Sequence, residues 1–306
     1  MMDSYDGIQY VGELFKITPA ITPFTSMIGG LSGGRQSKTK EFTWQTVDNA
    51  AAAQPSISET SAAAGQTASQ RTPTQAKNVH QIHQYDLDLS YRDLGTADEI
   101  SGVSILGEQP VQDPMAFQQT LVMERAARDV EYSFLQGVYA GPVNVGTATT
   151  TKGLKNAITT NTVAAGGSAL SRDMAQEVFR EMATSLAPFR NMVIFANAFN
   201  KQRLTDIYGF APDSRNVGGL NIRTIETDFF TAGVVWAPLM PTDEIYIVDM
   251  SVCAPHFLPV PGKGHVFWEN KAAPGASEKW QLYFDIGLEF GPEQWHGSIT
   301  GLATSA

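Results

Sequence analysis

A long stretch of small, almost uncharged residues near the start of the chain strongly limits how this sequence can fold. Residues 50–70 read AAAAQPSISETSAAAGQTASQ, and Glu59 is their one charged side chain. Loops of this length without structure are uncommon in compact monomers. We therefore expect this segment to be the tip of an arm.

Strand-like patterns flank this segment on both sides. Residues 41–45 alternate with a period of two, and after the segment the side chains of Tyr85, Leu87, Leu89 and Tyr91 share one face. The two patterns predict a long two-stranded projection. Because an isolated hairpin is marginally stable in water, we expect the arm to gain its order from a neighbouring molecule.

Composition excludes several classes of protein. The 306 residues are 42% hydrophobic, which is ordinary for a globular protein, and 21 basic against 31 acidic residues give a net charge of -10. This charge argues against a dedicated nucleic-acid binder and against binding to an anionic membrane surface. One cysteine, Cys253, excludes an intramolecular disulfide framework and is typical of a reducing compartment. We expect neither a secretion signal nor a membrane span.

The first 36 residues predict an extended N-terminal arm. Thr18-Pro19 and Thr22-Pro23 disfavour helix, and paired glycines follow at 29–30 and 33–34. This arm carries an apolar anchor formed by Ile21, Phe24, Met27 and Ile28. The anchor either straps over the chain's own core or contacts another subunit, and the sequence leaves both readings open.

A long helix is predicted over residues 114–136. Asp113 can cap it, Pro114 suits its first position, and Gly137 suits a left-handed exit. Its apolar stripe is Met123, Ala126, Ala127, Val130 and Phe134. At about 1.5 Å per residue, this helix is on the order of 35 Å long, enough to support a whole domain.

A second compact unit is predicted after a domain boundary near residue 168. Ser171 caps one helix, Asn197 caps a second helix over 198–208, and a buried strand lies between them at 192–196. Further strands are expected at 220–226, 232–237, 244–249 and 279–289. The mixture predicts an α+β fold.

No residues converge on a recognisable catalytic, cofactor or metal site. His80 and His83 would point to opposite faces of a strand, which disfavours a metal pair. Cys253 and His256 lack a third group and an oxyanion-hole motif, so we expect a buried, inert thiol. The Gly29–Gly34 run lacks the lysine of a phosphate loop. Asp86 and Asp88 are read as solvated charges. We therefore expect no enzyme activity, no cofactor and no metal.

In series, several segments resemble one known family. ITPFTSMIGG, KEFTWQ, MERAARDVEYSFLQG, TKGLKNAI, TIETDFFTAGVVWAPLMPTDEIYIVD and IGLEFGPEQWHGSITGL are similar to segments of the SU10-like branch of tailed-phage major capsid proteins, which have the HK97-like fold. The resemblance covers nearly the whole chain, and each segment alone is weak.

The resemblance implies a domain plan and an architecture. The plan is an N-terminal arm at 1–36, an extended loop at 37–90, a peripheral domain at 91–168 and 262–306 with a long spine helix, and an axial α/β domain at 169–261. Members form hexamers and pentamers that tile an icosahedral phage head around double-stranded DNA. No long helical scaffolding segment precedes Ile21, so assembly is expected to use a separate scaffold or none, and portal and decoration proteins are expected partners.

The same resemblance implies a place of action and a set of contacts. We expect a virion protein that assembles in the bacterial host cytoplasm. Lys38, Lys40 and Lys77 make a covalent lysine-asparagine link between subunits conceivable. The predicted intersubunit residues are Ile21, Phe24, Phe42, Trp44, Tyr85 and Leu87. The alternatives are an encapsulin-like nanocompartment shell, a β-rich decoration or adhesin protein, and a soluble enzyme.

Overall fold

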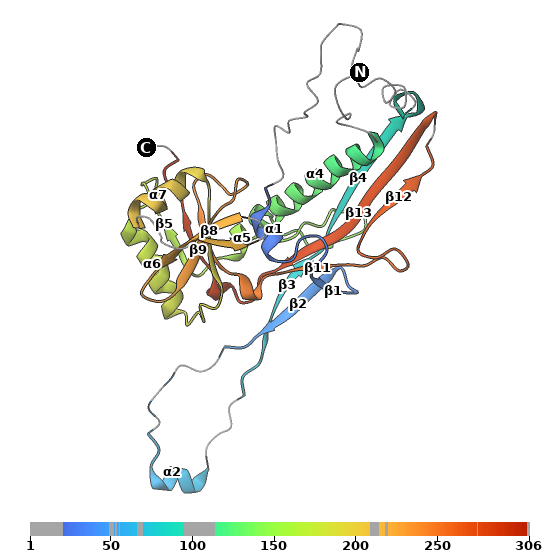
Figure 1. Ribbon diagram of the computed structural model, residues 1–306. Coiled ribbons are helices and arrows are strands. Elements are labelled where there is room, and N and C mark those ends of the chain that lie inside the picture. The colour runs from blue at the N-terminus through green and yellow to red at the C-terminus, as the bar shows by residue number, and fades with distance from the viewer. Residues whose placement is uncertain are drawn as a thin grey trace.

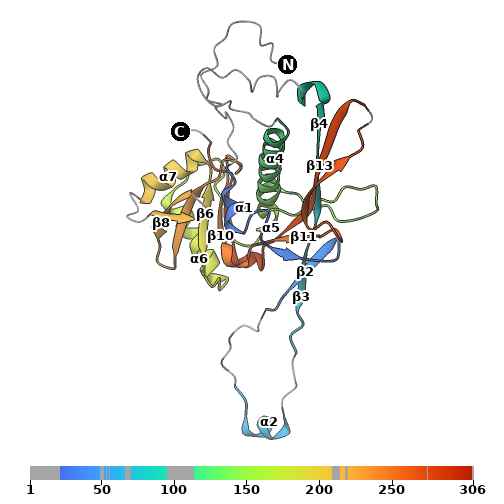
Figure 2. The same cartoon turned by 45° about the vertical axis from the view of Figure 1, so that its right-hand side comes forward.

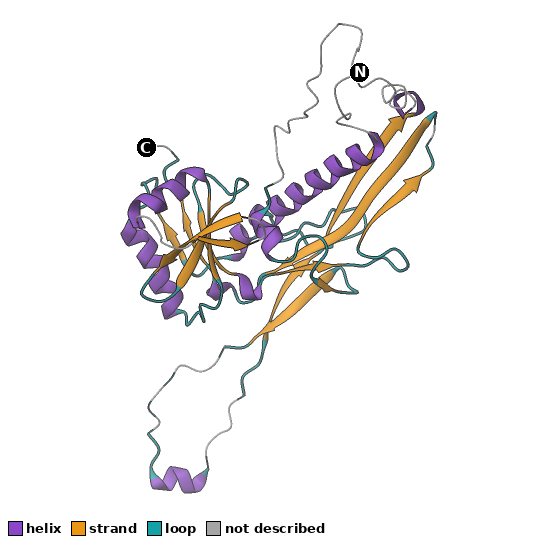
Figure 3. Ribbon diagram, in the orientation of Figure 1, coloured by secondary structure: helices purple, strands orange, loops and turns teal. Residues whose placement is uncertain are grey.

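The computed structural model describes residues 21–48, 52, 54, 56–65, 70–94, 114–208, 214–217, 220–273 and 275–304. A long, mainly antiparallel sheet backed by one helix lies beside a second unit, a mixed sheet flanked by helices (Figure 1). A thin two-stranded loop leaves the body. Coloured by secondary structure, the long strands gather on one side of the molecule and most helices on the other (Figure 3). This arrangement confirms the predicted α+β class.

A five-stranded sheet is organised around one long central strand. β13 (Ser277–Glu289) pairs with β4 (Gln81–Ser90) along one edge. Along its other edge it pairs with β12 (Val266–Lys271) and then β11 (Ala254–Phe257), and β1 (Arg35–Gln36) adds to β11 in parallel. The predicted alternation is confirmed, because Leu282, Phe284 and Ile286 are fully buried on one face.

Helix α4 (Pro114–Gln136) covers that face with the predicted bounds. Ala126, Val130 and Phe134 of its stripe are fully buried, whereas the predicted cap Asp113 lies outside the described residues. The left-handed exit at Gly137 is wrong, since this glycine has no positive φ. A Cβ on it would instead lie 2.5 Å from the carbonyl oxygen of Thr151, so the residue permits a close backbone approach.

The second unit is built on a seven-stranded mixed sheet. Its strand order is β5 (Thr162–Ala164), β14 (Gly297–Thr300), β10 (Ile245–Asp249), β6 (Met192–Ala196), β9 (Thr231–Trp236), β8 (Leu220–Glu226) and β7 (Ser214–Val217). Helices α6 (Arg172–Thr184) and α7 (Ala198–Tyr208) pack on it. Both predicted caps are confirmed: Ser171 accepts from the Met174 N–H at 3.3 Å and Asn197 from the Asn200 N–H at 2.7 Å.

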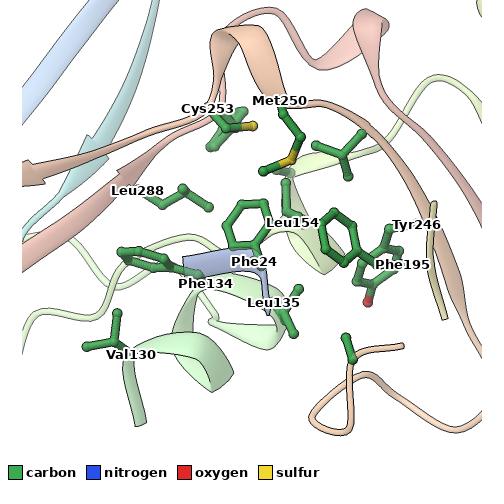
Figure 4. Close-up of a cluster of buried hydrophobic side chains, with 14 of the residues drawn as sticks. Phe24, Val130, Phe134, Leu135, Leu154, Phe195, Tyr246, Met250, Cys253 and Leu288 are labelled. Carbon is green, nitrogen blue, oxygen red and sulfur yellow. The ribbon is translucent and has the colours of Figure 1, made fainter. Parts of the chain in front are cut away.

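One hydrophobic core joins the two units. Strand β6 is buried on both faces: Ile194 packs toward α6, whereas Phe195 packs with Phe24, Phe134 and Leu288 of the other unit (Figure 4). Short helix α5 (Leu154–Ala157) and the 3-10 turn η1 (Met250–Val252) supply Leu154 and Met250 to the same cluster. The continuous burial of residues 192–196 thus reflects two cores that share one strand.

The N-terminal anchor straps over the chain's own core. In helix α1 (Pro23–Met27), Phe24 is fully buried and packs edge-on against Phe195, with ring centroids 5.5 Å apart. The backbone N–H groups of Phe24 and Thr25 donate to the buried Glu131 carboxylate at 3.0 and 2.7 Å, and the Thr25 hydroxyl donates to it at 2.6 Å. Residues 23–27 therefore pack on the core of their own subunit, which is the first of the two alternatives predicted for the anchor.

The projecting loop, defined here as residues 41–79, departs from the prediction in its pairing. β2 (Glu41–Thr46) pairs with β3 (Thr74–Val79), and the strand containing Tyr85 and Leu87 pairs with β13 instead. The sequence of β3, TQAKNV, is polar on both faces over most of its length, so no alternation marked it as a strand. A short helix, α2 (Glu59–Ala64), closes the tip of the loop (Figure 2).

The two sheets draw strands from both sides of several boundaries in the predicted domain plan. The five-stranded sheet includes β1 of the N-terminal arm at 1–36, β4 of the extended loop at 37–90 and β11 of the axial domain at 169–261. The seven-stranded sheet includes β5 and β14, which the plan assigns to the peripheral domain at 91–168 and 262–306, and β14 follows the 3-10 turn η2 (Glu293–Trp295). The partners of β4 and β5 are distant in sequence, so a linear reading could not identify them.

Candidate intersubunit surface

The base of the projecting loop is seated on the five-stranded sheet, on the face opposite α4. The ring of Phe42 lies over Gly287 of β13, where an added Cβ would come within 2.6 Å of the ring and of the Val79 carbonyl oxygen. Phe42 also stacks on His256, with ring centroids 4.2 Å apart and planes 6° apart. A glycine is needed at 287 so that the loop can approach the sheet this closely.

Trp44 ties the next part of the loop to the same region. Its Nε1–H donates to the Gly291 carbonyl at 2.9 Å, and its ring meets Phe290 edge-on at 4.9 Å. Trp44 is half-buried, so part of the indole is satisfied within the subunit and part faces solvent.

A charged cluster fixes the sheet beneath the loop base. Glu289 of β13 accepts from Nη1 of Arg35 at 2.7 Å through each carboxylate oxygen, and it contacts His256 Nε2 at 2.5 Å. Arg35 lies in β1, so this cluster links the N-terminal segment to the centre of the sheet. Charge-assisted hydrogen bonds of this kind are stronger than neutral ones.

The structure places the six predicted intersubunit residues in two groups. Phe24, Phe42 and Leu87 are buried in their own subunit, at 0%, 5% and 8% exposure. A side chain already covered by its own chain has little surface left for a neighbour, so these three can act on an interface only by positioning other groups. Ile21, Trp44 and Tyr85 keep part of their surface exposed.

The tip of the projecting loop is the clearest surface that its own subunit leaves uncovered. Helix α2 has no buried residue, although Ser58 caps it by accepting from the Ser61 N–H at 3.1 Å. Ile57 beside it is 49% exposed. The tip is locally ordered by its own cap while its side chains remain available for contact.

Several apolar residues are exposed, among them Tyr132, which lies off the apolar stripe of residues 114–136 and was expected to pack under another element. Val143 and Val145 are 81% and 99% exposed in the loop after α4, and Ile82 and Tyr132 are 56% and 53% exposed on β4 and α4. Ile82 falls on the polar face of the alternation in β4, and Tyr132 falls off the stripe of α4. An apolar residue out of phase with its element marks Tyr132 in the sequence, and the same signal could have identified Ile82.

His80, His83 and Cys253 lie in surroundings that give them a structural role. His80 contacts the Lys40 carbonyl and the Ser37 hydroxyl at 3.0 and 3.1 Å, and His83 stacks on Phe284. Burial lowers the pKa of His83 to about 4 and raises the pKa of the Cys253 thiol, so both are neutral near pH 7.

The parts of the chain that the structure describes contain no cluster of three potential metal ligands. None of the described helices is long and apolar enough to cross a bilayer.

Known structures share this architecture. The capsid asymmetric unit of Cyanophage A-1(L) matches with a TM-score of 0.67 and 14% identity, covering 98% of each chain. Mycobacterium phage Bobi matches with a TM-score of 0.62 and 10% identity, covering 97% of this chain and 96% of the other. The SrpI encapsulin complex of Synechococcus elongatus matches with a TM-score of 0.57 and 10% identity, covering 89% and 86%. These likenesses establish the HK97-type fold.

Sequence comparison identifies the family. No curated protein matches the chain. The family model described as SU10 major capsid protein matches residues 2–303, which is nearly the whole sequence. The resemblance drawn from the sequence segments is thereby confirmed, and the chain belongs to the SU10 major capsid protein family.

Proposed function

We propose that identical copies of this chain tile as hexamers and pentamers into an icosahedral phage head that encloses double-stranded DNA, and that the role is structural rather than catalytic. The observation that carries the proposal is the projecting loop, whose tip has no buried residue in its own subunit. In a lattice of repeated subunits, an ordered surface that its own subunit does not cover can contact a neighbouring subunit.

The dimensions of the loop support contact with a neighbour. Residues 47–58 between β2 and α2 can span at most about 40 Å when extended. That reach exceeds the thickness of a sheet covered by one helix, so the tip can lie over an adjacent subunit. Each contact can be weak, because many subunits engage at once and effective concentration multiplies their effect.

The proposed domain roles follow the sheets. We assign the five-stranded sheet with α4 to the peripheral domain, and the seven-stranded sheet with α6 and α7 to the axial domain. The partly exposed Ile21, Trp44 and Tyr85 are the proposed direct intersubunit contacts. Phe24, Phe42 and Leu87 are proposed to hold those contacts in place.

Further partners belong to the same proposal. A separate scaffold, a portal and decoration proteins are expected at the assembled head, and assembly is placed in the bacterial host cytoplasm. The net charge of -10 favours a shell that encloses DNA without binding it in a sequence-specific way.

An encapsulin-like nanocompartment is the second candidate function. The likeness to the SrpI encapsulin complex favours it, because that shell shares the fold. The two candidates differ in cargo: isolation of particles from the native source with DNA inside supports a phage head, and enzyme cargo without DNA supports a nanocompartment.

The testing experiment measures the size of the purified protein at rising concentration by light scattering, followed by negative-stain imaging. Closed shells, sheets, or pentamers and hexamers are the expected result. A protein that stays monomeric at high concentration and under crowding would contradict self-assembly and favour a decoration or adhesin role.

A further inference from the structure

The projecting loop has a two-stranded sheet of its own. β2 and β3 pair with each other, and within the described residues no ladder joins either strand to the five-stranded sheet. Side chains at the base therefore hold the loop against the body, together with the two connections of the chain. A two-stranded unit attached in this way can rotate about its base without breaking a sheet.

His80 lies at the joint between the loop and the body, because it is the one residue between β3 and β4. The other connection is residues 37–40, which join β1 to β2. The backbone N–H of His80 donates to the Lys40 carbonyl at 3.0 Å, and ring Nδ1 lies 3.0 Å from the same oxygen. Since Nδ1 faces a carbonyl, it carries the proton of the neutral ring, and Nε2 accepts from the Ser37 hydroxyl at 3.1 Å. One side chain thus clamps both connections of the loop.

The clamp closes beside the aromatic contacts that seat the loop. The ring of Phe42 contacts the imidazoles of both His80 and His256, with ring centroids 4.8 and 4.2 Å apart. His80 is only 2% exposed, so a charge on its ring would be held away from water. The nearby side-chain amide of Asn78 donates to the Leu288 carbonyl at 2.7 Å, which fixes a pivot at the end of β3.

No carboxylate is placed to balance a charge on His80. Within the described residues, neither of its ring nitrogens contacts an acidic side chain. The charged and titratable groups around the base are Arg35, Lys40, Glu41, His256, Asp285 and Glu289. Glu289 already binds Arg35 and His256, and Glu41 already binds Lys77.

The surroundings of His80 set the direction of its response to pH. Burial lowers the pKa of the His80 ring, hydrogen bonds to the carbonyl groups of Lys40 and Thr39 oppose the shift, and a charge on His256 adds to it. With the base open, His80 would have its ordinary pKa of about 6.5. The open form therefore binds the proton more readily than the seated form, and a fall in pH favours opening. Between pH 7.5 and 5.5, one histidine can change this equilibrium by at most about tenfold.

We propose that His80 is an acid-sensitive clamp at the hinge of the projecting loop: acidification frees the base of the loop from the five-stranded sheet and lets the loop change its angle to the body. This switch belongs to the single subunit, so it goes beyond the proposed role in a shell and does not depend on it.

The test is amide hydrogen exchange of dilute, unassembled subunits at pH 7.5 and 5.5. Peptides covering residues 37–46 and 74–80 are followed, and each rate is divided by the intrinsic rate at that pH. Acidification should speed exchange in the wild type between about threefold and tenfold more than in His80→Gln, whose side chain keeps a donor and an acceptor but takes up no proton.

The matched control is His265→Gln, the same change in a histidine that packs on Phe257 outside the clamp. It should keep the pH dependence of the wild type. Burial raises the pKa of Asp285 to about 6, so this carboxyl acts in the opposite direction, but it does so in all three proteins and the comparison isolates His80.

A second measurement needs no variant. In NMR spectra of the wild type with labelled histidine, His80 should titrate with a midpoint below about pH 6.5, and the signals of Phe42 and Trp44 should change with the same midpoint. The proposal fails if His80→Gln keeps the wild-type pH dependence, if His265→Gln loses it, or if His80 gains its proton while Phe42 and Trp44 stay unchanged. None of these results bears on whether the subunits assemble, which light scattering decides.

Discussion

At the scale of single residues, Glu131 decides where the N-terminal segment lies. Its fully buried carboxylate accepts from the N–H groups of Phe24 and Thr25 and from the Thr25 hydroxyl. Burial raises the pKa of Glu131, and these hydrogen bonds oppose that effect. The carboxylate thus satisfies the first free amides of a helix that is too short to stand alone.

Glu131→Ala is expected to destabilise the free subunit by about 3 kcal/mol, because buried donors on α1 lose their acceptor. Urea unfolding of unassembled protein measures this loss. Glu177→Ala, at an exposed position on α6, is the control and should change the midpoint little. Equal midpoints for the two variants would show that Glu131 does not anchor α1.

Asp285 predicts a dependence of stability on pH. Burial raises the pKa of this carboxyl to about 6, although the charge of Lys40 opposes the shift, and its Oδ1 has no partner in the described part of the chain. The folded state therefore holds a proton between roughly pH 4 and 6 that the unfolded state has released. This contribution to stability is present below pH 4 and is lost as pH rises through 6.

Asp285→Asn removes the titration. After allowance for solvent screening, the variant should exceed the wild type in unfolding free energy by about 1–2 kcal/mol more at pH 7.5 than at pH 4.5. Urea unfolding at both values measures the difference. Asp88→Asn, an exposed position on the same sheet, is the matched control for the substitution itself. A constant offset for Asp285→Asn would contradict a raised pKa.

At the scale of elements, local signals were predictable and distant pairings were not. The bounds of α4 and the alternation of β13 depend on residues that are neighbours in sequence, and the structure confirms both predictions. The partner of β4 lies about 200 residues away, since Ser90 pairs with Ser277, and no local pattern encodes it. The sequence predicts Phe42 and Trp44 as apolar anchors between subunits, but Phe42 is buried in its own subunit. Apolarity alone does not reveal whether a side chain is covered by its own subunit or by another.

The tip of the projecting loop allows a clean separation of folding from assembly. Replacing residues 56–65 with two glycines removes only exposed side chains and should shift the melting temperature of the free subunit by less than about 2 °C. Particle formation, followed by light scattering, should fall at least tenfold.

A second variant keeps the length of the tip but replaces residues 59–64 with Gly and Ser, which tests the helix separately from the reach of the loop. Normal assembly by both variants would mean that the tip makes no contact with a neighbour. A large loss of melting temperature would mean that the tip packs on its own subunit.

At the scale of the whole molecule, electrostatic repulsion between identical subunits opposes their association. Each copy carries a net charge of -10, and the Debye length falls from about 30 Å at 0.01 M to about 10 Å at 0.1 M salt. Screening therefore favours association of identical subunits.

The threshold concentration for particle formation should fall several-fold between about 20 and 200 mM NaCl, as measured by light scattering. KCl at equal ionic strength should give the same threshold, because screening depends on charge and not on the ion. A threshold that rises with salt would show that contacts between opposite charges dominate the interfaces.

The central position of β13 has a consequence for synthesis of the protein. This strand is the shared partner of β4, β11 and β12, and it ends at Glu289 of 306 residues. A nascent chain therefore cannot complete the sheet until β13 has left the ribosome. A product truncated before β13 would lack the strand that carries Gly287, so the base of the projecting loop would have no sheet to rest on.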